Sequence, residues 1–341
     1  MLFVVIFFLW LSLLIYLLMA GADFGAGILE LFSRGKNKSL IRETSYHIMG
    51  PIWEANHMWL IIAVVVLFVG FPEVYTTVSV YLHIPLVIML FGIIARGTSF
   101  SFRNYDAIKD HWQKFHSKIF VYSSFVTPLF LGIIAGSAVS KNIDPGATSF
   151  TAAYINSWLN WFSISTGLFT VSLCGFLASV YLIGEVQEPG AKQIYFHNAR
   201  IMNLSMIVCV IAIFIAASSG NIPLGSWIFG NSIGLTMVAC SIISLVLIWA
   251  MINKGKVRMM RFFTGLMVSS LLVAVTYPHF PNIVLFKNGE SLSLLEVGSA
   301  KTIQVLGIAL LLGSLFILPA FIFLIYRFGK KDEGAIVEKT K

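Results

Sequence analysis

The sequence predicts an all-α integral membrane protein with nine transmembrane helices, its N-terminus outside the cell and its C-terminus in the cytoplasm. The first observation behind this prediction is composition: 58% of the 341 residues are hydrophobic and 11% are charged, against about 25% charged in an average soluble domain. The second is the mean hydropathy of +0.87. The third is the alternation of long apolar runs with short basic loops. A soluble fold could not bury so much apolar surface, whereas lipid favours an apolar exterior.

Nine apolar runs are long enough to cross a hydrocarbon core of about 30 Å. We expect helices at about 2–23, 52–71, 76–95, 118–138, 158–182, 200–219, 228–252, 259–277 and 303–326. No Lys or Arg precedes the first run, which is longer than the apolar part of a typical signal peptide, so we expect it to remain as the first helix. We predict one membrane domain over 1–341, with helices 1–4 in about 1–138, helices 5–9 in about 158–327 and a cytoplasmic tail at 328–341.

The basic residues predict the orientation through the positive-inside rule. Of the 23 Lys and Arg residues, all but Lys141, Lys287 and Lys301 follow the first, third, fifth or seventh run or close the chain. This alternation requires an odd number of spans. The net charge is +8, but the charges form short clusters between apolar runs, which indicates topology and not a nucleic-acid surface.

Ionisable side chains within membrane helices are costly and are therefore candidates for function. Asp23 lies near the cytoplasmic end of the first predicted helix, and Arg96 ends the third on the same side. Glu54 and His57 lie at the start of the second helix, three residues apart and thus on one face. Glu30 follows Asp23 by seven residues on the same face and nearer the water.

Two interpretations of this polar group remain open, and they can coexist. In the first, the carboxyl groups form a proton path from the cytoplasm, because such groups in a low-dielectric site can take up and release protons near neutral pH. In the second, Arg96 forms an ion pair with Asp23 or Glu54 that holds the first three helices together. A secondary transporter or channel that uses Asp23, Glu54 and Arg96 is the alternative function, although no paired broken helices are evident.

The sequence gives no sign of a metal or heme site within this chain. The three cysteines, Cys174, Cys209 and Cys240, each lie inside an apolar run and are expected to be buried. His83 lies two residues before Pro85 and is expected to be a packed side chain beside a kink. The histidines within the predicted helices are not paired in a way that suits heme or copper. We expect no bound metal and no cofactor held by this chain alone.

Three segments resemble motifs of the second subunit of cytochrome bd-type quinol oxidases. They are Gly21–Leu29, which ends the first helix, Trp53–Leu60, which opens the second, and Arg96–Arg103, which follows the third. The fourth helix adds a similar pattern of small residues and proline at Ser123, Ser124, Pro128, Gly132 and Gly136. These motifs cover about the first 140 residues, and the remainder resembles the family in hydropathy and length.

The resemblance implies two four-helix bundles plus one peripheral helix in the bacterial plasma membrane. It implies a non-heme subunit of a terminal oxidase that couples quinol oxidation to the reduction of oxygen to water, without catalytic residues of its own. Hemes b558, b595 and d and the quinol site are expected in a partner, the heme-bearing subunit I. Membrane lipids and a small single-helix third subunit are further expected partners.

The resemblance also assigns residues. Asp23 and Glu54 match acids of the family's proton path, and Trp59 matches a tryptophan near an oxygen channel. We add Glu30 and His57 as candidates for the proton path, and Arg96, Arg103 and Asn56 as structural or charge-pairing residues. The chain departs from the family at Ala20, where many members have a second aspartate, and at His57, where others have glutamine. We hypothesise that His57 supplies a compensating titrating group.

Overall fold

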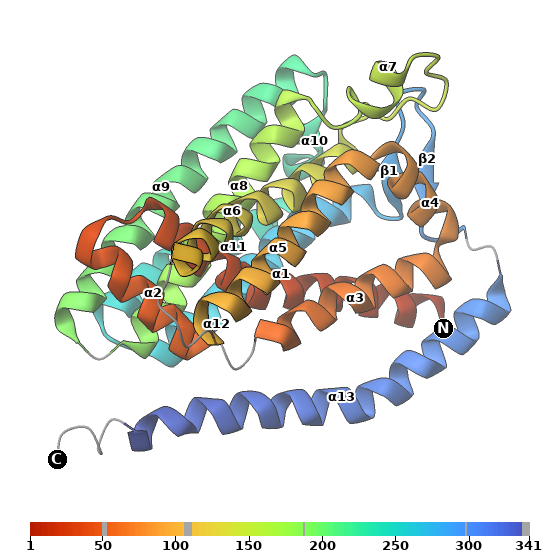
Figure 1. Ribbon diagram of the computed structural model, residues 1–341. Helices are drawn as coiled ribbons and strands as arrows, with labels where there is room; N and C mark the ends of the chain where they lie inside the picture. The colour runs from red at the N-terminus through yellow and green to blue at the C-terminus, as the bar shows by residue number, and fades with distance from the viewer. Residues whose placement is uncertain (50–52, 106–110, 187, 297–298, 336–341) are drawn as a thin grey trace.

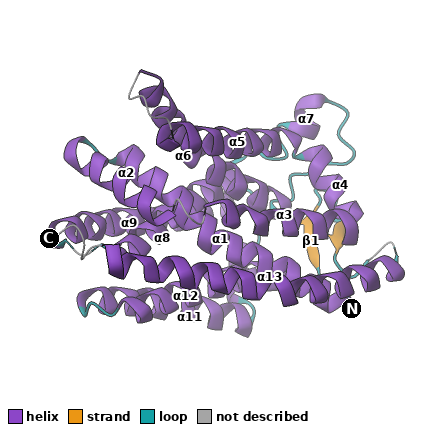
Figure 2. Cartoon of the chain, turned by 60° about the horizontal axis from the view of Figure 1, so that its bottom comes forward, coloured by secondary structure: helices purple, strands orange, loops and turns teal. Residues whose placement is uncertain are grey.

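The computed structural model describes residues 1–341 except 50–52, 106–110, 187, 297–298 and 336–341 (Figure 1). The side chains of 47–49, 53–54, 104–105, 111 and 324–335 also lie outside the described part. Figure 2 shows that the described chain is almost entirely helical, with one small pair of strands. The predicted helical membrane fold is confirmed at this level.

Eight helices of the described chain are long and apolar enough to cross a membrane by themselves. They are α1 (Leu2–Phe32), α5 (His83–Tyr105), α6 (His111–Val139), α8 (Trp161–Glu185), α9 (Pro189–Ser219), α11 (Ser232–Asn253), α12 (Val257–Thr276) and α13 (Ala300–Ala335). A backbone in lipid must satisfy its own hydrogen bonds, and these long uninterrupted helices do so.

The second predicted span appears as one arm of a bent helix pair. Helix α3 (Trp53–Gly70) is followed after Phe71 by the short helix α4 (Pro72–Tyr81), and the two are bent by 113°. Proline has no backbone N–H and is favoured in the first turn of a helix, so Pro72 begins a new helix in a new direction. Taken together, α3 and α4 are long and apolar enough to form one span, so the described chain has eight or nine candidate spans.

The predicted third span at 76–95 is wrong at both ends. Residues 76–81 belong to α4, and the membrane helix α5 begins at His83 and runs to Tyr105. Arg96, which was expected to end this span, and Arg103, which was expected in the connection after it, therefore both lie inside the helix. Both guanidinium groups are paired with carboxylates inside the protein, so the helix continues past the point where hydropathy falls. Helix α13 likewise runs to Ala335, into the tail predicted at 328–341.

Shorter elements occupy the connections. A helix that the sequence did not predict, α2 (Gly35–Met49), follows α1, and the short helices α7 (Phe150–Tyr154) and α10 (Leu224–Phe229) precede α8 and α11. The 3-10 turn η1 (Tyr277–His279) follows α12. Strands β1 (Asn282–Leu285) and β2 (Ser291–Ser293) form an antiparallel hairpin, which is the exception to the all-α prediction.

Helix α1 lies in the middle of the molecule and packs against α3, α6 and α8. Helices α5 and α6, α8 and α9, and α11 and α12 form closely packed pairs, while α13 lies along the outside against α1 and α3 (Figure 1). Glycine permits the close approach of α1 and α8, since a Cβ on Gly25 would overlap the backbone carbonyl of Cys174. Elements α4, α7 and the hairpin gather at one end, and α2 lies at the other.

Candidate functional site

Two buried ion pairs connect α1 to α5. The Arg96 Nη2 atom lies 2.6 Å from Asp23 Oδ1, and the Arg103 Nη1 atom lies 2.8 Å from Glu30 Oε2. All four side chains are at most 2% exposed. Isolated charges at such depth would be very costly, so their pairing is what allows them to be buried.

The spacing of the charges along both helices explains why the two ion pairs lie at two different heights along α1 and α5. Asp23 and Glu30 are seven residues apart on α1, and Arg96 and Arg103 are seven apart on α5. Seven residues make about two turns, or about 10 Å along a helix. Each helix therefore presents both of its charges on one face, and the long arginine side chains of α5 reach the acidic face of α1. We call these four residues the paired charge stack.

Helix α6 lies beside the paired charge stack and contributes an aromatic ring and a hydroxyl group. The guanidinium carbons of Arg103 and Arg96 lie 4.1 Å and 4.9 Å from the centroid of the Phe120 ring. Arg96 Nε donates to Ser124 Oγ at 3.2 Å, and this hydroxyl donates to the carbonyl of Phe120 at 2.7 Å. A cation over a ring gains electrostatic attraction that increases when water is excluded.

We call Asp23 with Arg96 the upper pair and Glu30 with Arg103 the lower pair. The upper pair has more contacts with described residues than the lower pair. Arg96 Nη2 also donates to the backbone carbonyl of Asp23 at 3.2 Å. Asp23 Oδ2 and Glu30 Oε1 accept no hydrogen bond from the described residues. Each carboxylate therefore has one oxygen fixed by an arginine and one that no described protein group occupies.

Helix α3 places an imidazole near Asp23 and Arg96, and it also carries a buried amide. The His57 ring packs against those of Tyr16 and Phe24, at centroid distances of 6.2 Å and 5.9 Å, and these two rings also contact each other at 6.4 Å. His57 lies within electrostatic range of Asp23 and Arg96. Asn56 is fully buried, and its amide has no hydrogen-bond partner among the described residues.

Two other residues of α3, Trp59 and Glu54, were predicted to be functional, and the structure describes the side chain of the first but not of the second. The Trp59 side chain is buried, and its ring packs edge-on against Phe321 of α13 at 5.3 Å. Glu54 belongs to the first turn of α3, but its side chain lies outside the described part of the chain. The structure thus brings together Asp23, Glu30, Arg96 and Arg103, places His57 near them, and leaves Glu54 undescribed.

Sequence reasoning missed the pairing of Glu30 with Arg103 and the role of Phe120. The signal for the pairing was present, because the same seven-residue spacing occurs in both helices. Ser124 was noted only as part of a motif, and no sequence pattern predicted that its hydroxyl contacts Arg96.

The two histidines that lie within the predicted spans, His83 and His57, do not suit a heme. His83 Nδ1 lies 2.8 Å from the carbonyl of Val80, and its ring packs against Tyr154. The His57 ring packs against the aromatic rings of Tyr16 and Phe24. Among the described residues, no group of three or more His, Cys, Asp or Glu side chains could hold a metal ion. These surroundings do not fit axial ligation, which needs an imidazole facing a cavity. That this chain alone holds no heme stays a prediction.

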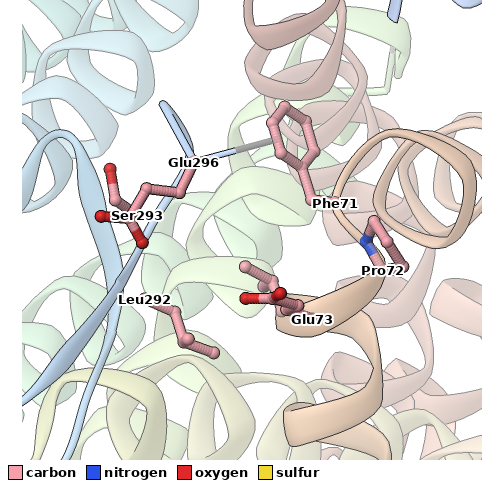
Figure 3. Close-up of a pocket in the computed structure, with 7 residues that line it drawn as sticks. Phe71, Pro72, Glu73, Leu292, Ser293 and Glu296 are labelled. Atoms are coloured by element: carbon pink, nitrogen blue, oxygen red, sulfur yellow. The ribbon is translucent and has the colours of Figure 1, made fainter. Parts of the chain in front are cut away.

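A small pocket lies at the other end of the molecule, between the start of α4 and the segment around β2 (Figure 3). Its lining includes the carboxylates of Glu73 and Glu296 and the side chains of Phe71 and Ser293. The volume of about 10 Å³ is at the lower limit for a single water molecule. Both glutamates are exposed, so solvent screens their charges. This pocket does not resemble a substrate site.

The amino-acid sequence of this chain is similar to those of one family of known proteins. The family model described as cytochrome bd terminal oxidase subunit II matches residues 1–328. The chain is 29% identical over 182 residues to the cytochrome bd ubiquinol oxidase subunit 2 of Bacillus subtilis, covering 52% of each protein. It is 26% identical over 193 residues to the cytochrome bd-I ubiquinol oxidase subunit 2 of Escherichia coli, covering 55% of this chain and 50% of that one. The chain spans about half the length of the curated relatives it matches.

A solved structure extends the likeness to the fold. The bd oxidase from Geobacillus thermodenitrificans matches with a TM-score of 0.76 at 18% identity, over 94% of this chain and 96% of the matched chain. At this identity the likeness concerns the fold alone. These comparisons give no support to the transporter alternative.

Proposed function

The chain belongs to the cytochrome bd terminal oxidase subunit II family, and from this we propose that it is the non-heme subunit of a quinol oxidase that reduces oxygen to water. The observation that carries the proposal is the family match over residues 1–328, supported by the fold match over nearly the whole chain. The chain is a subunit of an oxidoreductase and is not catalytic alone. It acts in the bacterial plasma membrane.

The proposed topology has nine spans, with α3 as the second and the N-terminus outside. The helices would form two four-helix bundles, α1, α3, α5 and α6 in one and α8, α9, α11 and α12 in the other, with α13 peripheral. The packing of α5 on α6, α8 on α9 and α11 on α12 supports this grouping. The orientation is supported by the basic residues that follow alternate spans.

The proposed partner is the heme-bearing subunit I, which would hold hemes b558, b595 and d and bind the quinol. The hemes supply the electron transfer and oxygen chemistry when bound in that partner. Exposed apolar side chains on α3, α5 and α13, as on other long helices, are open to contact with lipid or protein; they include Phe68, Phe91 and Phe316. A small single-helix third subunit and membrane lipids would complete the assembly.

The paired charge stack is the proposed proton path in this chain. Glu30 is nearer the end of α1 that carries α2, and Asp23 lies two turns deeper. A proton would add at Glu30 Oε1 and then at Asp23 Oδ2, the oxygens without a hydrogen-bond partner among the described residues. The levels are about 10 Å apart along α1, so a proton must pass through intervening groups. His57 would be the next titrating group, and Glu54 remains a candidate at the start of α3.

The paired charge stack also supports a structural role that does not exclude the first. Arg96 connects α5 to the side chain and backbone of α1 and to Ser124 of α6. One buried cation therefore fixes three helices. Arg103 and Asn56 are assigned the same kind of role. Trp59 remains the candidate for an oxygen channel, and its close contact with Phe321 supports a packed wall for such a channel.

Purification tests the proposed function directly. The full chain, carrying an affinity tag and extracted from its native membrane, should bring a second chain that contains heme. The complex should show a reduced-minus-oxidised difference spectrum and consume oxygen when a quinol is added. A chain that purifies alone and colourless, from membranes that themselves show bd-type absorption, would overturn the proposal.

A further inference from the structure

A groove on the surface of helices α9 and α11 has the features of a lipid-binding site. It has a volume of about 360 Å³ and is lined by Arg200, Asn203, Leu204 and Ile207 of α9 and by Trp249 of α11. The groove is largely open to the surface, so a ligand there would remain in contact with the surrounding bilayer, unlike one in an enclosed small-molecule cleft. The groove is unrelated to the paired charge stack, whose residues belong to α1 and α5.

Aromatic packing builds the groove. The Trp249 ring packs perpendicular to that of Phe196 of α9 at 5.4 Å and also contacts Phe176 of α8 at 6.4 Å. The indole therefore bridges from α11 to α9 and α8. The guanidinium carbon of Arg200 lies 4.3 Å from the centroid of the same Phe196 ring, so stacking holds the cation at the rim.

The charge of Arg200 is available to a ligand. Its side chain is exposed, and it forms no ion pair among the described residues, whereas Arg96, Arg103 and Arg261 each pair with a carboxylate. A guanidinium presents several N–H donors in a plane and binds phosphate oxygens in a bidentate manner. An anionic phosphate group is the complementary ligand.

Apart from the Asn203 amide, the rest of the groove is apolar and extends away from the cation. Leu204 and Ile207 are 63% and 48% exposed, which suits contact with hydrocarbon. From Arg200 to Ile207 the helix rises by about 10 Å. Arg200 is the first residue of the span predicted at 200–219, and Trp249 lies near the end of α11 at Asn253. A tryptophan and an arginine at one level are typical of a membrane interface.

We propose that this groove binds an anionic phospholipid, with the phosphate on Arg200 and an acyl chain along Leu204, Ile207 and Trp249. The proposed orientation puts Arg200 at the cytoplasmic leaflet, where anionic lipids attract basic residues. The inference rests on that orientation but not on oxidase activity. It goes beyond the proposed function, because the lipid takes no part in the reaction.

Native mass spectrometry of the full chain, with the subunits that purify with it, tests the proposal. Delipidated protein is titrated with phosphatidylglycerol or with phosphatidylcholine of the same acyl chains. The unmodified protein should retain phosphatidylglycerol in preference to phosphatidylcholine. In Arg200→Gln the tightest phosphatidylglycerol site should weaken about fivefold, as expected for one basic residue at a lipid surface. Arg200→Lys keeps the charge and should retain most of the binding.

Lys192→Gln is the matched control, because it removes a positive charge from an exposed residue of the same helix that does not line the groove. It should leave the tightest site unchanged. Equal weakening in Lys192→Gln and Arg200→Gln would show a diffuse surface effect and overturn the proposal. Equal retention of the two lipids by the unmodified protein, or undiminished phosphatidylglycerol binding in Arg200→Gln, would also overturn it. Loss of oxidase activity plays no part in the readout.

Discussion

At the residue scale, the central feature is that four buried charges are arranged as two unequal pairs. Arg96 contacts Asp23 twice and Ser124 once, so the upper pair is fixed by three helices. Arg103 is paired with Glu30, and one nitrogen of each guanidinium, Arg96 Nη1 and Arg103 Nε, has no hydrogen-bond partner among the described residues. The lower pair is therefore the one in which a single substitution most directly exposes the cost of an unpaired charge.

Replacing Glu30 tests this cost. Glu30→Leu leaves the buried guanidinium of Arg103 without its carboxylate, and breaking a buried pair in this way costs about 3–5 kcal/mol. The double variant Glu30→Leu with Arg103→Met replaces the pair by apolar groups, which is often neutral, so most of the loss should be recovered. The measurement is the thermal unfolding midpoint of the detergent-solubilised protein. If the double variant is as unstable as the single one, Glu30 stabilises the fold through contacts other than this pair.

Asp23→Asn separates the proton-path role from the structural role. The amide keeps the shape and one acceptor for Arg96 but cannot carry a proton. A proton-path role predicts that proton uptake by the assembled oxidase falls by about 100-fold, the lower range for loss of a positioned proton-transfer group. Uptake is followed with a pH-indicator dye after an oxygen pulse, at equal amounts of assembled complex.

Asp144→Asn is the control for Asp23→Asn, since Asp144 pairs with Lys287 in an exposed connection, where an ion pair contributes little. It should change neither uptake nor assembly. A purely structural role for Asp23 gives the opposite pattern: less assembled complex, with normal uptake by the complex that remains.

The sequence predicted the members of the site better than their pairing. Asp23 with Arg96 was one of two alternatives, because depth within the membrane can be estimated from hydropathy but rotation about the helix axis cannot. The pairing of Glu30 with Arg103 was missed because Arg103 was assigned to a loop. The contribution of Phe120 depends on how α6 packs beside α5, and no short pattern in one sequence specifies that contact.

At the element scale, hydropathy located the apolar helices but not the changes of chain direction. A window of apolar residues measures preference for lipid and is the same for a straight and a bent segment. It therefore could not show that Pro72 begins a helix bent by 113° from α3. Helix α2 was missed for the opposite reason, since its polar composition resembles that of a basic loop.

The crossing of α1 and α8 gives a prediction at this scale. A Cβ on Gly25 would overlap the backbone carbonyl of Cys174, which cannot rotate away as a side chain can. Gly25→Ala should therefore force the helices apart and destabilise the protein by about 1–3 kcal/mol, the usual cost of overpacking. The thermal unfolding midpoint should fall.

Gly265→Ala in α12 is the matched control. A Cβ at this position has no neighbour within 4 Å, and alanine favours a helix by up to about 1 kcal/mol relative to glycine. The midpoint should stay the same or rise. An equal fall in both variants would mean that the loss reflects glycine within membrane helices in general and not the contact with α8.

At the scale of the whole molecule, the two ends differ in charge and in architecture. At the end of the molecule that carries α2, the residues that follow α1 include four basic ones, Arg34, Lys36, Lys38 and Arg42. The opposite end carries α4, α7 and the hairpin (Figure 1), and its connections hold few basic residues. Translocation disfavours basic loops, so the asymmetry both supports the proposed orientation and makes it open to a direct test.

Cysteine labelling in intact cells provides this test. Asn37 of α2 and Thr148, which precedes α7, are both exposed, and they lie in connections at opposite ends. With a membrane-impermeant maleimide, Thr148→Cys should be labelled in intact cells, and Asn37→Cys only after the membrane is permeabilised. The unmodified chain is the control. Its Cys174 is buried, and Cys209 and Cys240, which are half-buried and not fully buried as the sequence predicted, lie within apolar candidate membrane helices. Labelling of Asn37→Cys in intact cells, with Thr148→Cys protected, would invert the orientation. The proton path would then open to the outside, and Arg200 would face the outer leaflet.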